Sequence, residues 1–183
     1  MDELVQTGKI RYWGVSNHSG AQVSEYVELE KTTDTAPVAG TEDYYNIAGE
    51  SIDPKGCSRT SQLEREMFPI IRQSKLGFIA FSPLDSGNLS PKQQIKPTSP
   101  LAELVQVLDH TAQNLHVTRA ELCVAWVLTH TEVTTVLSGA ESPEHVDQNL
   151  AGTQLFLPQE VIKTLNTANK AYRKKTKQKL VNR

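Results

Sequence analysis

The chain has 183 residues, of which 38% are hydrophobic and 22% are charged, and its formal net charge at pH 7 is −2. These values are typical of one soluble domain and give no reason to expect a nucleic acid or an anionic membrane as a partner. No stretch approaches the ~18 apolar residues of a membrane span, and none resembles a secretory signal. Cys57, in a polar loop, and Cys123, in an apolar run, are too few for a disulfide framework, which favours a reducing, cytoplasmic location.

The first predicted element is the end of a helix over residues 2–7, closed by Gly8, a residue that favours the left-handed backbone of helix C-termini. A helix this short cannot offset the cost of its own nucleation. We therefore expect that the chain is truncated and that further residues normally precede this helix.

Four short apolar runs then predict β-strands, each followed by a helix-like stretch, over residues 10–17, 38–47, 77–84 and 133–139. Alternation of strand and helix is typical of a parallel sheet, so the expected fold class is α/β. Three of the runs close on small and polar residues, namely Ser16-Asn17, Ser82-Pro83-Leu84 and Ser138-Gly139-Ala140. Because ligands of parallel sheets bind at the carboxyl ends of the strands, we expect a ligand site there.

Capping patterns mark the starts of the intervening helices. A Ser or Thr followed three residues later by Gln or Glu is a capping box, and it occurs at Ser19/Gln22, Ser61/Glu64 and Thr118/Glu121. Ser142 followed by Pro143 opens another helix. A long irregular loop is predicted over 85–100, and the last helix, from Pro158, is expected to lead into a solvated basic extension over 173–183.

The strand ends carry groups suited to a nucleotide, although each has a simpler reading. The helix from Ser142 directs free backbone N–H groups toward Gly139, which suits a phosphate or is a plain capped helix. Ser16 and Asn17 can hydrogen-bond a carboxamide or simply form a strand-end turn, with Asn17 or Ser19 capping the next helix. Phe81 can stack on a flat heterocycle or fill the core. The five histidines lack metal-ligand spacing, so no metal site is predicted.

In their order and separation, these segments resemble the C-terminal half of an aldo-keto reductase. The matching segments are Gly-Lys-Ile-Arg-Tyr-Trp-Gly-Val-Ser-Asn over 8–17, Tyr-Asn over 45–46, Phe-Ser-Pro-Leu over 81–84, Ser-Gly-Ala-Glu-Ser-Pro-Glu over 138–144 and Gln-Asn-Leu over 148–150. Members of that family are (β/α) barrels that reduce carbonyl groups with a nicotinamide cofactor, usually NADPH. The resemblance implies a partial (β/α) TIM barrel over residues 1–172, with four parallel strands and flanking helices.

The resemblance also implies which residues hold the cofactor, NADP(H) or NAD(H). From the carboxamide to the adenine they are Ser16, Asn17, Glu42, Phe81, Ser82, Leu84, Gly139, Ala140, Glu141, His145, Gln148 and Asn149. The first three would lie at the carboxamide, and Phe81 would stack on the nicotinamide. Ser82 and Leu84 would line the pyrophosphate, and the remaining residues would surround the adenosine end.

Three of these residues depart from the family pattern. Glu42 stands in place of a glutamine, Phe81 in place of a tyrosine, and Glu141 in place of the arginine of many relatives. A carboxylate at position 141 repels a 2′-phosphate, which leaves the choice between NADPH and NADH open. A carboxylate at position 42 only accepts hydrogen bonds, so it is expected to weaken the hold on the cofactor.

The resemblance further implies that a part of the enzyme is missing. The family's catalytic tyrosine, lysine, aspartate and histidine come from the first half of the barrel, and nothing in this chain aligns with that half. No catalytic residue is therefore predicted, and the chain alone is expected to be inactive because no proton donor stands beside the carbonyl.

The open edges and inner face of a half barrel predict a partner, either a second copy in a homodimer or a complementing barrel half. The alternative function, from another class, is a non-catalytic module that senses a nucleotide or interacts with a protein, as barrel-like relatives do as channel subunits. Binding without turnover would favour that alternative.

Overall fold

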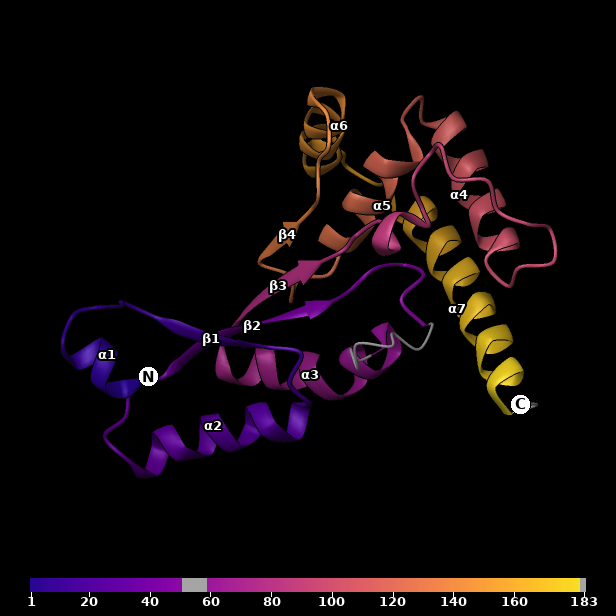
Figure 1. The fold of residues 1–183 in the computed structure, drawn as a ribbon. Helices are drawn as coiled ribbons and strands as arrows, with labels where there is room; N and C mark the ends of the chain where they lie inside the picture. The colour runs from indigo at the N-terminus through magenta and orange to yellow at the C-terminus, as the bar shows by residue number, and fades with distance from the viewer. Residues whose placement is uncertain (51–58, 182–183) are drawn as a thin grey trace.

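The computed structural model describes residues 1–50 and 59–181, which form four parallel strands with flanking helices (Figure 1). The strands lie in the sheet in chain order and are β1 (Trp13–Ser16), β2 (Val38–Tyr44), β3 (Gly77–Phe81) and β4 (Thr135–Leu137). All neighbouring pairs are parallel, and Phe81 lies between Tyr44 and Leu137 in the register. The predicted α/β class is confirmed, and each strand is shorter than the apolar run that predicted it.

The described helices are α1 (Asp2–Gln6), α2 (Gly20–Thr32), α3 (Thr60–Ser74), α4 (Ala102–Asn114), α5 (Arg119–Leu128), α6 (Pro143–Gln154) and α7 (Gln159–Val181), with a 3-10 turn, η1 (Asp85–Gly87). Helix α1 ends as predicted, since Gly8 adopts a φ of 71°. In Figure 1, α2 and α3 lie together below β1 and β2, while α6 packs against α5 and α7 against α4.

The two faces of the sheet differ because side chains alternate along each strand. On the helix side the side chains are buried, as for Thr41, Asp43, Phe78 and Ala80. On the other face Glu42, Ile79 and Phe81 are half-buried, and Leu137 is 55% exposed. Figure 1 shows no helix over this second face among the described residues. The hydrophobic core therefore lies between the sheet and one layer of helices.

Two of the three predicted capping boxes are confirmed, those of Ser19/Gln22 and Thr118/Glu121. The box predicted at Ser61 and Glu64 is wrong, because α3 begins at Thr60 and has no side-chain cap. Ser61 instead donates from its backbone N and its Oγ to the buried carboxylate of Glu50, at 2.7 and 2.8 Å. A contact with a residue eleven positions away has replaced the local cap.

The segment from residue 173, predicted as a solvated basic extension, is helical, because α7 continues to Val181. Arg173 donates to both carboxylate oxygens of Glu64 at 2.6 Å, and its Nε lies 3.4 Å from Glu50. This ion pair holds α7 against α3. Of the described helices, none has the length and apolar character needed to cross a membrane. Cys57, expected in a polar loop, lies outside the described residues, as do the other residues of 51–58.

Candidate functional site

The ends of the four strands meet at one edge of the sheet, as their parallel arrangement requires. They border an open cavity of about 490 Å³, here called the strand-end cleft. Its lining residues are Ser16, Asn17, Glu42, Phe81, Ser82, Leu137, Ser138 and Gly139. The residues predicted from the resemblance to lie at the carboxamide and the nicotinamide are therefore neighbours in the fold.

Two strand ends turn sharply at the cleft. Asn17 and Ser82 both adopt left-handed backbone, with φ values of 57° and 55°. This conformation costs a non-glycine residue roughly 1 kcal/mol, least for Asn, and is retained where the surroundings impose it. The Asn17 N–H donates to the Glu42 carbonyl at 3.1 Å, and Asn46 Nδ2 donates to the Ser82 carbonyl at 3.0 Å. Buried Asn46 thus fixes the turn that starts the loop after β3.

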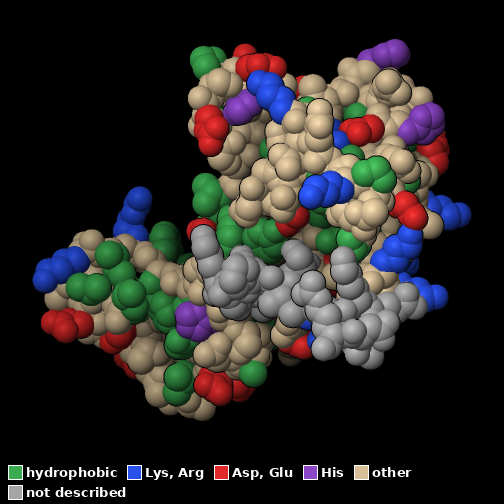
Figure 2. Space-filling model, turned by 45° about the vertical axis from the view of Figure 1, so that its right-hand side comes forward, with side chains coloured by type: hydrophobic (Ala, Val, Ile, Leu, Met, Phe, Trp, Pro, Cys, Tyr) green, Lys and Arg blue, Asp and Glu red, His purple; other side chains and the backbone are tan. Residues whose placement is uncertain are grey.

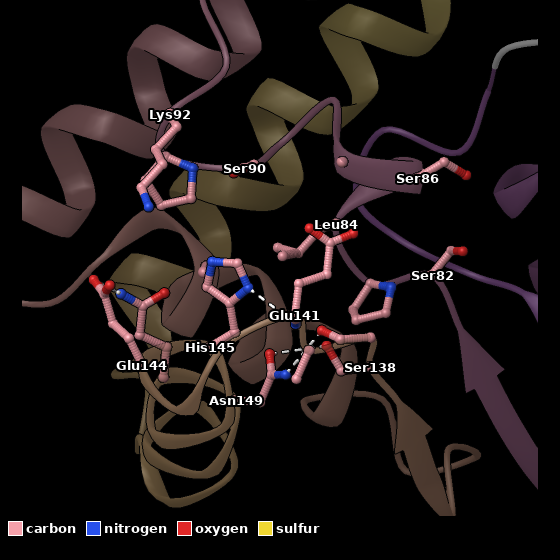
Figure 3. Close-up of a pocket in the computed structure, with 17 residues that line it drawn as sticks. Ser82, Leu84, Ser86, Ser90, Lys92, Ser138, Glu141, Glu144, His145 and Asn149 are labelled. Carbon is pink, nitrogen blue, oxygen red and sulfur yellow. Dashed lines mark hydrogen bonds between the residues drawn. The ribbon is translucent and has the colours of Figure 1, made fainter.

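A deeper cavity of about 480 Å³ adjoins the cleft and shares Ser82, Ser138 and Gly139 with it (Figure 3). We call it the α6 pocket. One wall is the loop after β3, through Pro83, Leu84, Ser86, Gly87, Ser90, Pro91 and Lys92. The opposite wall is the end of β4 and the start of α6, through Ala140, Glu141, Glu144, His145, Gln148 and Asn149, with Ala120 of α5 completing the lining. Its volume suits a small-molecule ligand.

The α6 wall is fixed by local hydrogen bonds. As predicted, Ser142 caps α6, accepting from the His145 N–H at 3.3 Å. Asn149 accepts from Ser138 Oγ at 2.8 Å and donates to the Gly139 carbonyl at 3.2 Å, which ties the helix to the end of β4. The remaining N–H groups and the positive end of the helix dipole suit an anionic group.

The charges in the α6 pocket come from both walls. Lys92 extends from the loop after β3 toward the α6 side, which carries Glu141, Glu144 and His145 (Figure 3). The Glu141 N–H donates to His145 Nδ1 at 3.3 Å. Lys92 can attract a phosphate, whereas the two carboxylates accept hydrogen bonds from hydroxyl groups. Lys92 was not predicted from the sequence. The feature that could have indicated it is its position in the predicted long loop, five residues after Gly87.

The loop after β3 contains a buried carboxyl group that accepts hydrogen bonds. Asp85 is 3% exposed, accepts a hydrogen bond from the Tyr44 hydroxyl, and accepts another from Asn88 Nδ2 at 3.1 Å. Burial raises the pKa of Asp85 from 3.8 to about 6. Asp85 and Ser86 both have left-handed backbone, with φ values of 52° and 53°. The loop therefore has a defined conformation, with hydrogen bonds both within it and to β2.

These features define a parallel α/β protein with two adjoining cavities along the carboxyl ends of its strands. Within residues 1–50 and 59–181, no group of three or more His, Cys, Asp or Glu residues is placed to hold a metal ion. The family model described as "Aldo/keto reductase family" matches residues 1–170. The chain belongs to this family.

Individual relatives agree with this assignment. The methylglyoxal reductase YeaE of Escherichia coli is 26% identical, with 96% of this chain and 54% of the relative covered. The NADH-specific methylglyoxal reductase of the same organism is 24% identical, with 86% and 48% covered. A crystal structure of the thermostable aldo-keto reductase Tm1743 with the inhibitor epalrestat is 24% identical and has a TM-score of 0.68, over 91% of this chain and 51% of the other. The chain spans about half the length of the curated relatives it matches.

Proposed function

We propose that this chain binds a nicotinamide dinucleotide, NAD(H) or NADP(H), along the carboxyl ends of its strands. The observation that carries the proposal is that every residue implied by the family resemblance lines either the strand-end cleft or the α6 pocket, and that these two cavities adjoin. These residues come from the strand ends and from the start of α6, so one ligand that spanned both cavities would contact all of these segments.

The available side chains fit the two ends of such a ligand. In the strand-end cleft, Ser16 and Asn17 supply hydroxyl and amide groups for a carboxamide, and Phe81 supplies an aromatic face. In the α6 pocket, Lys92 and the start of α6 suit the diphosphate and adenosine portion. When bound, the reduced nicotinamide would supply a hydride to a carbonyl carbon. The protein's part is to hold and orient the ring.

The choice between the two cofactors depends on Glu141 and Lys92. Lys92 favours the additional phosphate of NADP(H), whereas Glu141 repels it and can accept a hydrogen bond from a ribose hydroxyl. The opposing charges leave both cofactors as candidates. The NADH-specific reductase among the relatives shows by its name that NADH use occurs in similar proteins.

We propose that the 183-residue chain does not reduce carbonyls without another component. Among the described residues, no Tyr, Lys or His lines the strand-end cleft, where a carbonyl would have to receive a proton. Without a positioned acid, the developing alkoxide is not stabilised. Dinucleotide binding that still gives no turnover when a complementing barrel half is supplied would instead favour the alternative, a non-catalytic module that senses a nucleotide or interacts with a protein.

We further propose that the sheet is half of a barrel whose inner face is covered by a second copy of the chain. Support comes from the uncovered side chains of that face and from exposed hydrophobic side chains of the N-terminal segments, namely Leu4 in α1, Tyr12 before β1 and Leu29 in α2. Figure 2 shows hydrophobic side chains on the surface in this part of the molecule.

Light scattering at micromolar concentration is expected to give a dimer. A folded monomer would instead point to a complementing barrel half. We also propose a cytoplasmic location, because two cysteines are too few for a disulfide framework.

Calorimetric titration with NADPH and NADH tests the proposed binding. We expect saturable binding of at least one cofactor, and a loss of affinity of about tenfold in Lys92→Ala, because a cation facing the phosphates is removed. Lys96→Ala, outside the lining residues, serves as the matched control. Oxidation of the bound cofactor by a panel of aldehydes would refute the proposed inactivity, and no binding of either cofactor would refute the proposed site.

A further inference from the structure

Arg119, the first residue of α5, is 5% exposed and hydrogen-bonds to the backbone of the loop after β3. Its Nε donates to the Leu89 carbonyl at 3.0 Å. Its Nη2 donates to the carbonyl of Ser90 and, at 3.5 Å, to that of Gln93. These carbonyls bracket the stretch that presents Lys92 to the α6 pocket. Arg119 itself is absent from the pocket lining, so any effect on a ligand acts through the loop.

The guanidinium is also fixed from its other side. Nη1 of Arg119 donates to both carboxylate oxygens of Asp109 in α4, each at 3.0 Å. One buried group thus joins α5, α4 and the loop, using all three of its nitrogens. Lysine has a single nitrogen on a flexible stem and cannot span these partners together. The contacts therefore depend on arginine in particular.

We infer that Arg119 is a positioning residue that holds the wall formed by Ser90 and Lys92 in the shape that accepts the diphosphate portion of the ligand. The inference rests on the proposed function, because the diphosphate is the group proposed for this wall. Without Arg119, the Leu89 and Ser90 carbonyls lose their charged donor, and the loop loses these hydrogen bonds to α5 and the link through Arg119 to Asp109 of α4. Lys92 would then no longer be fixed opposite α6.

Hydrogen exchange of the loop amides and calorimetric binding of ADP test this role in the full chain. ADP carries the diphosphate and adenosine groups without the nicotinamide. In Arg119→Met we expect exchange over residues 84–93 to rise about tenfold and ADP affinity to fall about tenfold, with exchange in β2 and β3 unchanged. Arg119→Lys is expected to give the same changes at smaller size. It also serves as the test variant if the methionine variant fails to fold.

Arg65→Met is the matched control, because Arg65 pairs on the surface of α3 with Glu66 and has no contact with the loop. It should change neither measurement. Unchanged loop exchange in both Arg119 variants, or faster exchange with unaltered ADP affinity, would overturn the inference. If the unaltered chain binds neither ADP nor NAD(P)H, the proposed function fails, and the exchange data alone decide whether Arg119 fixes the loop.

Discussion

The hydroxyl of Tyr44 donates a hydrogen bond to Oδ1 of Asp85 and thereby joins the end of β2 to the loop that follows β3. The Tyr44 ring also packs edge-on against Phe81, with the ring centroids 5.8 Å apart. Phe81 lines the strand-end cleft, while the loop lines the α6 pocket. Tyr44 therefore contacts both Phe81, which lines the strand-end cleft, and Asp85, which belongs to the loop that lines the α6 pocket.

This pair predicts a pH dependence of stability that Asp85→Asn should reduce. Burial raises the pKa of Asp85 to about 6 in the folded chain, so the folded state binds the proton more tightly than the unfolded state. This group contributes about 3 kcal/mol to the free energy of unfolding below pH ~4, and that contribution is lost as the pH rises through ~6. Urea unfolding at several pH values measures it. Equal pH slopes in variant and wild type would contradict the assignment.

Glu141→Arg should shift the cofactor preference toward NADPH. The substitution replaces a repelling carboxylate with a guanidinium that can pair with a phosphate, so the ratio of NADPH to NADH affinity should rise about tenfold. Fluorescence titration gives both affinities. Glu144→Arg, one turn along the same pocket wall, controls for the change in net charge. If both variants shift the ratio equally, Glu141 has no special place beside the ligand.

Gly152→Ala should destabilise the packing of α6 on α5. A Cβ at Gly152 would lie 2.8 Å from Cβ of Val124 and 2.9 Å from the Glu121 carbonyl oxygen, so the helices would have to separate. We expect a loss of about 1–3 kcal/mol in the free energy of unfolding. Gly139→Ala is the control, because a Cβ there meets nothing within 4 Å. A Gly152→Ala protein as stable as this control would show that α5 and α6 are less closely packed.

Cys123 should be chemically inert in the folded chain. Its side chain is fully buried in α5, and burial raises the pKa of its thiol to about 12. The thiolate that reacts with iodoacetamide is therefore scarce at neutral pH. Labelling followed by peptide mapping, which scores Cys57 separately, should modify Cys123 in urea and leave it unmodified in native buffer. Rapid native labelling would contradict the burial.

Much of the fold could be predicted from the sequence because its signals are local. The apolar runs that end in small residues gave the strands, and Ser19 and Thr118 cap their helices with residues three positions away. The strand-end residues follow from the same logic, since parallel strands bring their carboxyl ends to one edge. The family resemblance then selected which of those residues to consider.

Other features could not be predicted because they depend on contacts between distant segments. Ser61 donates a hydrogen bond to Glu50 and does not cap its helix. Glu64 accepts from Arg173, which lies 109 positions later in the chain. Arg119 holds carbonyls about thirty residues earlier. None of these three sets of contacts leaves a periodic pattern in the sequence. Lys92 was missed for a similar reason, because only the folded loop directs it to the α6 pocket.

The central claim, that a dinucleotide lies along the strand ends, is tested most directly by amide chemical-shift changes on titration with NADPH or NADH. The account predicts saturable shifts over residues 82–92 and 138–149 and at Ser16 and Asn17, with amides of the distant α7 face, such as Lys163, unchanged. Shifts confined to other surfaces would contradict the account. The absence of shifts with either cofactor at millimolar concentration would also contradict it, because binding would then be weaker than a dissociation constant of ~10⁻³ M, or about −4 kcal/mol of binding free energy.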